Sequence, residues 1–148
     1  MIRVGKRRDQ VYLLQQLYLF AHYPANAAIF PWRGSRFAYE LMADLLADHV
    51  VLISEDKDGP AGFIAGRIGP SGLDPSETVL DSKFWWVNEN KRGSRHGHAL
   101  LDAFKKVGQN MSNVDYVVLT IEHESKVSDN TLKRLGWRPI QRSFILEV

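Results

Sequence analysis

The sequence predicts a single α/β domain with a mixed sheet that is mostly antiparallel. Its 148 residues are the length of one domain. Short apolar runs alternate with segments of helical periodicity, which is the pattern of an α/β protein. Two of these runs flank a tight turn and predict antiparallel pairing, whereas residues 84–87 and 116–121 flank a helical segment and predict a parallel pair.

The composition is that of a packed protein without cysteine chemistry. Hydrophobic residues make up 45% and charged residues 24%, so a disordered chain is excluded. The absence of cysteine removes disulfides, thiolate zinc sites and cysteine nucleophiles. The basic N-terminus has no apolar stretch behind it, and no apolar run reaches the ~20 residues of a membrane helix. We therefore expect a soluble, intracellular protein.

The first half of the chain is expected to form a strand, two helices and a hairpin. Helices are indicated where apolar residues recur at three- and four-residue spacing, and strands where apolar residues follow one another. Ser35 is expected to cap the second helix, while Asp58 and Gly59 supply the hairpin turn. The expected elements are a strand at residues 2–4, a helix from residue 9 to before Pro24, a helix from residue 35, and strands at 50–53 and 61–68.

The loop at residues 23–34 carries Ile29, Phe30 and Trp32. A solvated loop does not need such side chains, so this one is expected to fold over something. Two interpretations stay open. The loop either packs over the two helices or forms a wall of a substrate pocket.

The second half is expected to alternate strands and helices up to the C-terminus. Residues 116–121 are almost continuously apolar, which favours a central strand buried on both faces. Ser128 is expected to cap a short helix that Gly136 ends. The expected elements are strands at 84–87 and 116–121, a helix with Leu100, Phe104, Val107 and Met111 on one face, a helix at 128–135, and strands at 137–140 and 143–146.

The loop at residues 88–97 has the properties of an anion site. Residues 91–106 carry 5 basic groups and 1 acidic group, a net charge of +4. Glycines allow close approach of the backbone, and the amide groups at a helix start favour negative charge. The loop has neither the nucleotide P-loop pattern nor the dinucleotide glycine pattern. A phosphate group of another cofactor is therefore expected here.

The same residues carry a family resemblance. The stretch 87–101 resembles the acetyl-coenzyme A signature of the GNAT superfamily of N-acetyltransferases, [R/Q]-x-x-G-x-[G/A]. Arg92 stands at its first position and Gly97 at its last, while Arg95 replaces the middle glycine. Residues 132–140 resemble the last helix and turn of the family, and the signature variant is similar to small members encoded by tailed phages. The resemblance covers nearly the whole chain.

The resemblance implies a fold and a binding mode. The strand that carries the signature splays from the next parallel strand, with helices on both faces of the sheet, and the cleft accepts acetyl-coenzyme A. An acceptor amine then attacks the thioester directly, in a ternary complex. Backbone groups of the strand are expected to pair with the pantetheine arm, and amide groups of the loop are expected to hold the pyrophosphate. The expected cofactor-binding residues are Trp85, Trp86, Val87, Arg92, Gly93, Ser94, Arg95, His96, Gly97 and His98.

The acid and base of the family cannot be transferred to this sequence. Leu132 stands where the family often has a tyrosine that protonates the thiolate, and Ser125 stands at its asparagine position. Glu122, at the end of the strand 116–121, is the best candidate for the base, although a solvated carboxylate is the other interpretation. Ser125 or Ser128 could donate to the thiolate, also through water, and some family members rely on water and proximity.

Two other functions and several partners stay open. A coenzyme A-binding domain without catalysis, or one that binds a host protein, is compatible with the missing tyrosine. Nucleic-acid binding would use the basic groups, but the net charge of only +2 does not favour it. We expect no metal site, no membrane partner and an amine acceptor that is either a small molecule or a protein. A homodimer stays open, and the cytoplasm, of the host if the chain is phage-encoded, is the expected location.

Overall fold

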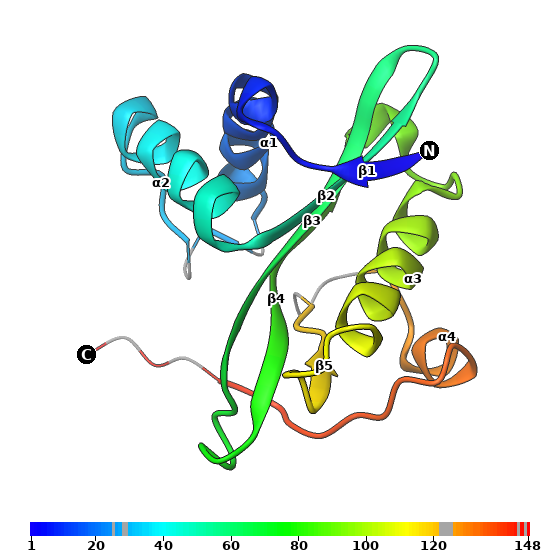
Figure 1. The fold of residues 1–148 in the computed structure, drawn as a ribbon. Coiled ribbons are helices and arrows are strands. Elements are labelled where there is room, and N and C mark those ends of the chain that lie inside the picture. The colour runs from blue at the N-terminus through cyan, green and yellow to red at the C-terminus, as the bar shows by residue number, and fades with distance from the viewer. Residues whose placement is uncertain (25, 28–29, 122–125, 145, 147) are drawn as a thin grey trace.

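A computed structural model of the chain describes residues 1–24, 26–27, 30–121, 126–144, 146 and 148. A twisted sheet separates α1 and α2 from α3 (Figure 1). The helices are α1 (Gln10–His22), α2 (Ser35–Asp48), α3 (His96–Gln109) and α4 (Asp129–Arg134), with short 3-10 turns η1 (Arg7–Asp9) and η2 (Glu89–Lys91). The strands are β1 (Ile2–Val4), β2 (Val50–Asp56), β3 (Gly59–Pro70), β4 (Thr78–Val87) and β5 (Tyr116–Val118).

The described strands form one sheet in the order β1-β2-β3-β4-β5. Neighbours are antiparallel except β4 and β5, which are parallel. Helix α3 connects these two strands, as a crossover between parallel strands requires. The mixed, mostly antiparallel sheet with helices on both faces is therefore confirmed. The β2–β3 hairpin is also confirmed, since Gly59 takes a positive φ of 106° at its turn.

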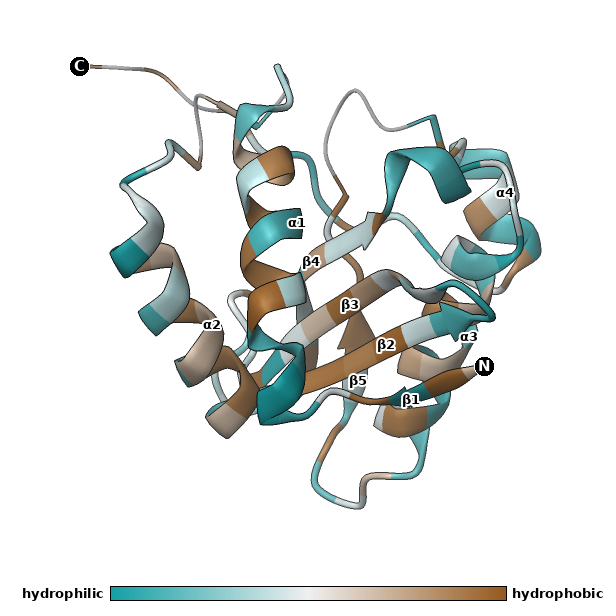
Figure 2. Ribbon diagram, turned by 90° about the horizontal axis from the view of Figure 1, so that it is seen from above, coloured by the Kyte–Doolittle hydropathy of each residue, from teal (hydrophilic) through white to brown (hydrophobic). Residues whose placement is uncertain are grey.

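Each face of the sheet has its own hydrophobic core. Leu13, Leu17 and Met42 of α1 and α2 are fully buried against one face, together with Phe63. On the other face, Leu100, Phe104 and Val107 of α3 pack against β2, β3 and β4. Figure 2 shows the hydrophobic residues concentrated on the central strands, between these helices. Trp85 and Trp86 belong to opposite cores, as the alternation along a strand predicts.

A β-bulge interrupts the pairing of β3 with β4. Ala65 pairs with Phe84 and Gly66 pairs with Ser82, so Lys83 is the extra residue. The pairing of β4 with β5 ends at the same level, with Asp81 opposite Val118.

One polar contact extends that pairing beyond its last register pair. The hydroxyl group of Ser82 accepts a hydrogen bond from the amide of Thr120 at 2.9 Å. Farther along, β4 keeps its partner β3, but among the described residues it has none on the β5 side.

Three predictions about local structure are wrong. The strand predicted at 116–121 spans only Tyr116–Val118 and lies at the edge of the described sheet, so the side chain of Tyr116 is 53% exposed. The described residues of 137–140 and 143–146 form no strands. Strand preference depends on an available partner, and Pro139 lacks a donor for one. Gly34, and not Ser35, occupies the N-cap of α2.

The predicted caps of the last helix are confirmed. The hydroxyl group of Ser128 accepts the amide of Thr131 at the start of α4. Gly136 has a φ of 90° just after its end. The amide of Trp137 donates to the carbonyl of Leu132, and the amide of Gly136 donates to that of Lys133, each at 3.0 Å. This is a Schellman motif, which satisfies the last carbonyl groups of the helix.

Replacing Gly66 with alanine is expected to lower the free energy of unfolding by about 1–3 kcal/mol, the usual effect of overpacking. A Cβ at this bulge position would lie 2.5 Å from Cζ of Phe104 and 2.7 Å from the carbonyl oxygen of Asp81. Equilibrium unfolding in urea measures the change. Gly69→Ala is the control, because nothing lies within 4 Å of its added Cβ. If both substitutions destabilise the protein equally, the close contacts of Gly66 with Phe104 and Asp81 do not explain the need for glycine at this position.

Candidate functional site

The loop between β4 and α3 presents a group of unpaired amides. It consists of η2, Gly93 with a φ of 79°, and the first turn of α3. The first amides of a helix have no intrahelical acceptor, and its dipole favours an anion there. Within the described part of the chain, the amide groups without a protein acceptor include those of Gly93, Ser94, Arg95, Gly97 and His98. The predicted anion site therefore has the donors that it requires.

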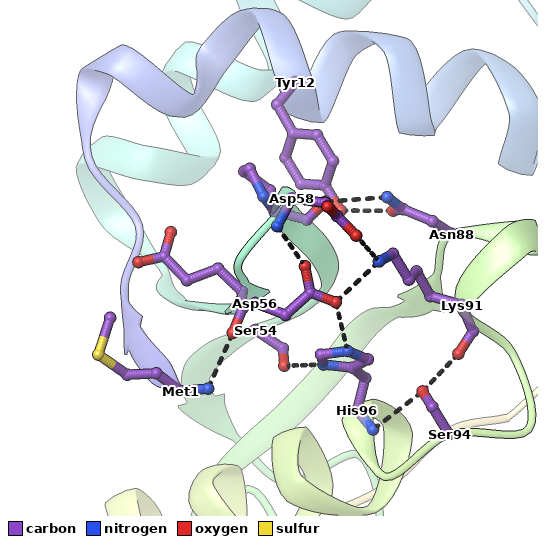
Figure 3. Close-up of polar contacts among 11 residues, drawn as sticks. Met1, Tyr12, Ser54, Asp56, Asp58, Asn88, Lys91, Ser94 and His96 are labelled. Atoms are coloured by element: carbon purple, nitrogen blue, oxygen red, sulfur yellow. Dashed lines mark hydrogen bonds and ion pairs between the residues drawn. The ribbon is translucent and has the colours of Figure 1, made fainter.

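Asp56, at the end of β2, fixes this loop to the β2–β3 hairpin (Figure 3). Its Oδ2 accepts from Nζ of Lys91 at 2.8 Å and lies 3.3 Å from Nε2 of His96. Lys91 also contacts Asp58 at 2.7 Å, and the other ring nitrogen of His96 lies 2.6 Å from the hydroxyl group of Ser54. The hydrogen bond from Lys91 lowers the pKa of Asp56 to about 2. The ammonium group of Lys91 is thus neutralised by carboxylates, and His96 is held by its side chain.

Arg92 uses its side chain to attach the loop to the end of β4. Its guanidinium carbon lies 4.3 Å from the ring centroid of Trp86 and 5.6 Å from that of Tyr23. Its Nε donates to the carbonyl group of Val87 at 3.1 Å. By contrast, the side chain of Arg95 has no hydrogen bond or ion pair with any described residue. Arg95 is therefore the free guanidinium next to the amide groups of the loop.

Asn88 closes β4 and was not identified from the sequence. Its side chain accepts from the hydroxyl group of Tyr12 at 2.7 Å and donates to the carbonyl of Pro60 at 2.9 Å. The backbone amide of Asn88 donates to the carbonyl of Ala61, also at 2.9 Å. Burial raises the pKa of Tyr12, so its hydroxyl stays protonated and acts as the donor. Asn88 joins α1, the hairpin and the start of the loop, and a polar residue at a strand end was its only sequence signal.

The end of β4 packs under the start of α3. Nε1 of Trp85 donates to the carbonyl group of Gly97 at 3.2 Å. A Cβ at Gly97 would lie 3.6 Å from Cγ2 of Val87 and 3.7 Å from Cζ2 of Trp85, which is ordinary contact.

A pocket of about 430 Å³ lies on the other face of the sheet, where the β4–β5 pairing ends. Phe30 lines it and packs edge-on against Phe20 and Phe84, with centroids 5.9 and 5.6 Å apart. Trp32, from the same loop, packs instead against Tyr18 of α1. Trp32 therefore packs on a helix, as one interpretation of the loop 23–34 predicts, whereas Phe30 lines a pocket whose role as a substrate site stays a prediction. Ile29 lies outside the described residues. The pocket is lined by Phe20, Phe30, Leu41, Asp44, Leu45, His49, Arg67, Lys83, Phe84, Thr120 and Ile121.

His49 is an ionisable group in the wall of this pocket. Its Nδ1 is buried and has no hydrogen-bond partner. Burial lowers its pKa, and the positive charges of Arg67 and Lys83 lower it further, against the opposing effect of Asp48 and Asp44. The imidazole is consequently neutral at pH 7.

The predicted catalytic residues are not brought together in the described part of the structure. Glu122 and Ser125 lie outside the described residues. The hydroxyl group of Ser128 caps α4 and lies 3.0 Å from that of Thr131. Leu132, one turn into α4, carries no proton donor.

The described residues contain neither a metal-binding cluster nor a membrane-spanning helix, and some of the basic groups near the loop are paired with carboxylates. The described side chains contain no cluster that could hold a metal ion. No described helix is long and apolar enough to cross a membrane. Lys105 and Lys106 contact Asp102 at 3.8 and 2.7 Å. These cations are thus partly compensated, as is Lys91.

The fold is a mixed α/β domain whose parallel strand pair ends near a loop with amide groups that have no acceptor among the described residues. Residues 12–137 match the model of the acetyltransferase (GNAT) family, and the chain belongs to this family. None of the curated proteins compared matches it.

Solved structures share the fold over the full length at low sequence identity. A ribosomal-protein-alanine N-acetyltransferase from Brucella melitensis biovar Abortus 2308 is 16% identical, with a TM-score of 0.73 and coverage of 100% of this chain and 99% of that one. A predicted acetyltransferase with acetyl-CoA from Clostridium acetobutylicum is 15% identical, with a TM-score of 0.70 and coverage of 99% and 95%. The enzyme AAC(6')-Iy with the bisubstrate analogue CoA-S-monomethyl-acetylneamine is 14% identical, with a TM-score of 0.76 and coverage of 100% and 97%.

The lowered pKa of His49 predicts a pH effect on stability. Between its folded pKa and its ordinary value of about 6.5, the unfolded chain binds a proton that the folded chain does not. The stabilisation is therefore complete above about pH 6.5 and is lost as the pH falls. Urea unfolding at pH 7.5 and 5.5 is expected to show a larger loss for the wild type than for His49→Gln. Equal losses in the two proteins would contradict a buried, neutral imidazole.

Proposed function

We propose that this protein transfers an acetyl group from acetyl-coenzyme A to a primary amine by direct attack in a ternary complex. One observation carries the proposal. The pairing of β4 with β5 ends between a loop of free amides on one side and an apolar pocket on the other. A long anionic cofactor and a separate acceptor can therefore reach the same break in the sheet from two sides. Such positioning is a large part of the catalysis of a bimolecular transfer.

The residues at the loop suit the phosphate end of the cofactor. The amide groups between Arg92 and His98 would hold the pyrophosphate, and Arg95 would add a charge-assisted contact. The backbone of Trp85, Trp86 and Val87 would pair with the pantetheine arm on the side of β4 where the described residues offer no strand. The cofactor supplies the activated acetyl thioester.

The transfer itself needs a neutral amine and a protonated leaving group. The amine nitrogen bonds to the carbonyl carbon, the carbon–sulfur bond breaks, and the thiolate takes up a proton. We assign the removal of the amine proton to Glu122 and the donation to the thiolate to Ser125 or Ser128, directly or through water. These assignments rest on the sequence resemblance, as does the proposed phage origin, whereas the proposed cytoplasmic location rests on the absence of an apolar signal or membrane segment in the sequence.

A coenzyme A-binding domain without turnover is the second candidate. The observation that favours it is Leu132, an aliphatic residue where the family often has its proton donor. Release of free thiol from acetyl-coenzyme A in the presence of a cell extract separates the two functions. The chain contains no cysteine, so every protein-dependent thiol signal comes from the cofactor. Mass spectrometry of the extract then identifies acetylated amines.

Acetyl-coenzyme A is expected to bind and to raise the melting temperature of the protein. At one hundred times its Kd a ligand stabilises by about 2.7 kcal/mol. Gly97→Glu is expected to abolish binding, because a carboxylate would compete with the pyrophosphate at the amide groups. Thermal unfolding with and without acetyl-coenzyme A measures the rise in melting temperature, and calorimetric titration measures binding. Gly72→Glu is the control, because nothing lies within 4 Å of a Cβ at Gly72. Unchanged affinity of the Gly97 variant would refute the placement of the cofactor.

The basic residues of the loop are expected to contribute unequally to cofactor affinity. Arg95→Ala should weaken binding by about 1–3 kcal/mol, the range for hydrogen bonds to charged groups, because no described residue pairs with this guanidinium. Lys91→Ala should have a smaller effect, because Asp56 and Asp58 already neutralise its ammonium group. Calorimetry of both variants decides the order. A larger effect at Lys91 would show that this ion pair opens when the cofactor binds.

A further inference from the structure

The pocket at the end of the β4–β5 pairing combines an aromatic interior with two cations. Phe20, Phe30 and Phe84 pack edge-on around its base, and Phe20 and Phe84 are buried. Arg67 of β3 and Lys83 of β4 also line it. The Lys83 bulge lies between Ser82 and Phe84, and both Lys83 and Phe84 reach the pocket. The bulge therefore places a cation beside the aromatic wall.

The two cations differ in their pairing. Nζ of Lys83 contacts the carboxylate of Asp81 at 2.8 Å. The guanidinium group of Arg67 has no hydrogen bond or ion pair with any residue that the structure describes. Asp44 is the one carboxylate among the described residues that line the pocket, and His49 is neutral at pH 7 by the argument above. Among the described cations of the pocket, Arg67 is therefore the one whose charged group has no partner among the described residues.

An unpaired guanidinium at an apolar pocket is suited to a carboxylate. Arg presents a planar fork of donors that matches a carboxylate in a bidentate contact, and the exposed side chain of Arg67 is accessible to such a ligand. A volume of about 430 Å³ is in the lower part of the range for small-molecule sites. The chemistry of the pocket therefore selects for one amine, one carboxylate and an apolar group of ring size.

We propose that the acceptor is a small amino acid-like molecule with a free carboxylate and an aromatic or similarly sized apolar side chain. Arg67 binds the carboxylate, and the phenylalanines enclose the side chain. This inference rests on the proposed acetyl transfer for the identity of the reacting amine. It differs from the acceptors in the names of the structural neighbours, a ribosomal-protein alanine and an aminoglycoside derivative.

The test compares L-phenylalanine with phenethylamine, which has the same ring and a primary amine but no carboxylate. Thiol release from acetyl-coenzyme A is expected to give a kcat/KM at least tenfold higher for L-phenylalanine. Arg67→Gln should raise KM for L-phenylalanine at least tenfold and leave phenethylamine unchanged. Arg36→Gln, an exposed arginine of α2 that contacts Glu40, should change neither substrate. Melting temperatures of both variants confirm that they fold.

Three results would overturn the inference. They are equal use of the two amines, an equal effect of Arg67→Gln on both, and a higher kcat/KM for neamine or for a lysine-containing peptide. Direct binding separates this inference from the proposed function. Calorimetric binding of L-phenylalanine without cofactor, lost in Arg67→Gln, supports the pocket assignment even if no transfer occurs. Binding of acetyl-coenzyme A without Arg67-dependent binding of L-phenylalanine refutes it and leaves the proposed transfer intact.

Discussion

The end of the β4–β5 pairing is the constraint on which the site depends. β4 continues to pair with β3 through Val87, but its register with β5 stops at Asp81 opposite Val118. Backbone groups away from water need partners, and each group left without one destabilises by about 1–3 kcal/mol. Ser82 satisfies the amide of Thr120, and among the described residues this contact is the last across the break. Beyond it, the amide groups of the proposed pantetheine arm would supply partners for β4.

The bulge at Lys83 makes this break compatible with a stable sheet. It adds a residue to β4 just where β5 departs, so β3 and β4 stay paired on the other side. Gly66 is required opposite the bulge because Phe104 of α3 and the backbone of Asp81 occupy the space of a side chain. The core under α3 and the geometry of the break are therefore coupled. A substitution chosen to fill this part of the core would also change the site.

In the loop between β4 and α3, side chains attach the loop to the rest of the protein, and the backbone amide groups are left for the proposed ligand. Lys91, Arg92 and His96 all have side-chain partners within the protein. The amide groups beside them remain free. A positively charged loop held in this way is ordered before its ligand arrives, so less conformational entropy is lost on binding. The side chain of Arg92, which the sequence pattern favoured as a phosphate ligand, contacts Trp86 in this structure.

Structural features that depend on residues close together in the chain were predicted correctly from the sequence. The hairpin at Gly59, the cap at Ser128 and the alternation of Trp85 and Trp86 depend on neighbours in the chain, and all are confirmed. The position of β5 at the edge of the described sheet depends on which distant segments pair with it. A local sequence pattern does not contain this information.

The pocket lined by Phe30, Arg67 and Lys83 was not predicted from the sequence, because it also depends on segments that are distant in the chain. Its residues come from α1, the loop before α2, α2 and the residue after it, β3, β4 and the segment after β5, so only the fold assembles them. A weak signal existed at Gly66, because an isolated glycine inside a strand often marks a bulge.

The Arg67 cation of the pocket also affects the proton transfers of the proposed reaction, for which Leu132 provides no proton donor. An amine attacks only when neutral, and a nearby positive charge lowers the pKa of an ammonium group. In the proposed complex, Arg67 would therefore hold the carboxylate of the acceptor and at the same time disfavour its protonated amine. Burial among the phenylalanines acts in the same direction, because it disfavours the charged form. Less of the deprotonation then falls to a dedicated base. A GNAT domain of this kind can rely on the pocket for a neutral amine and on a serine hydroxyl or water for the proton of the thiol.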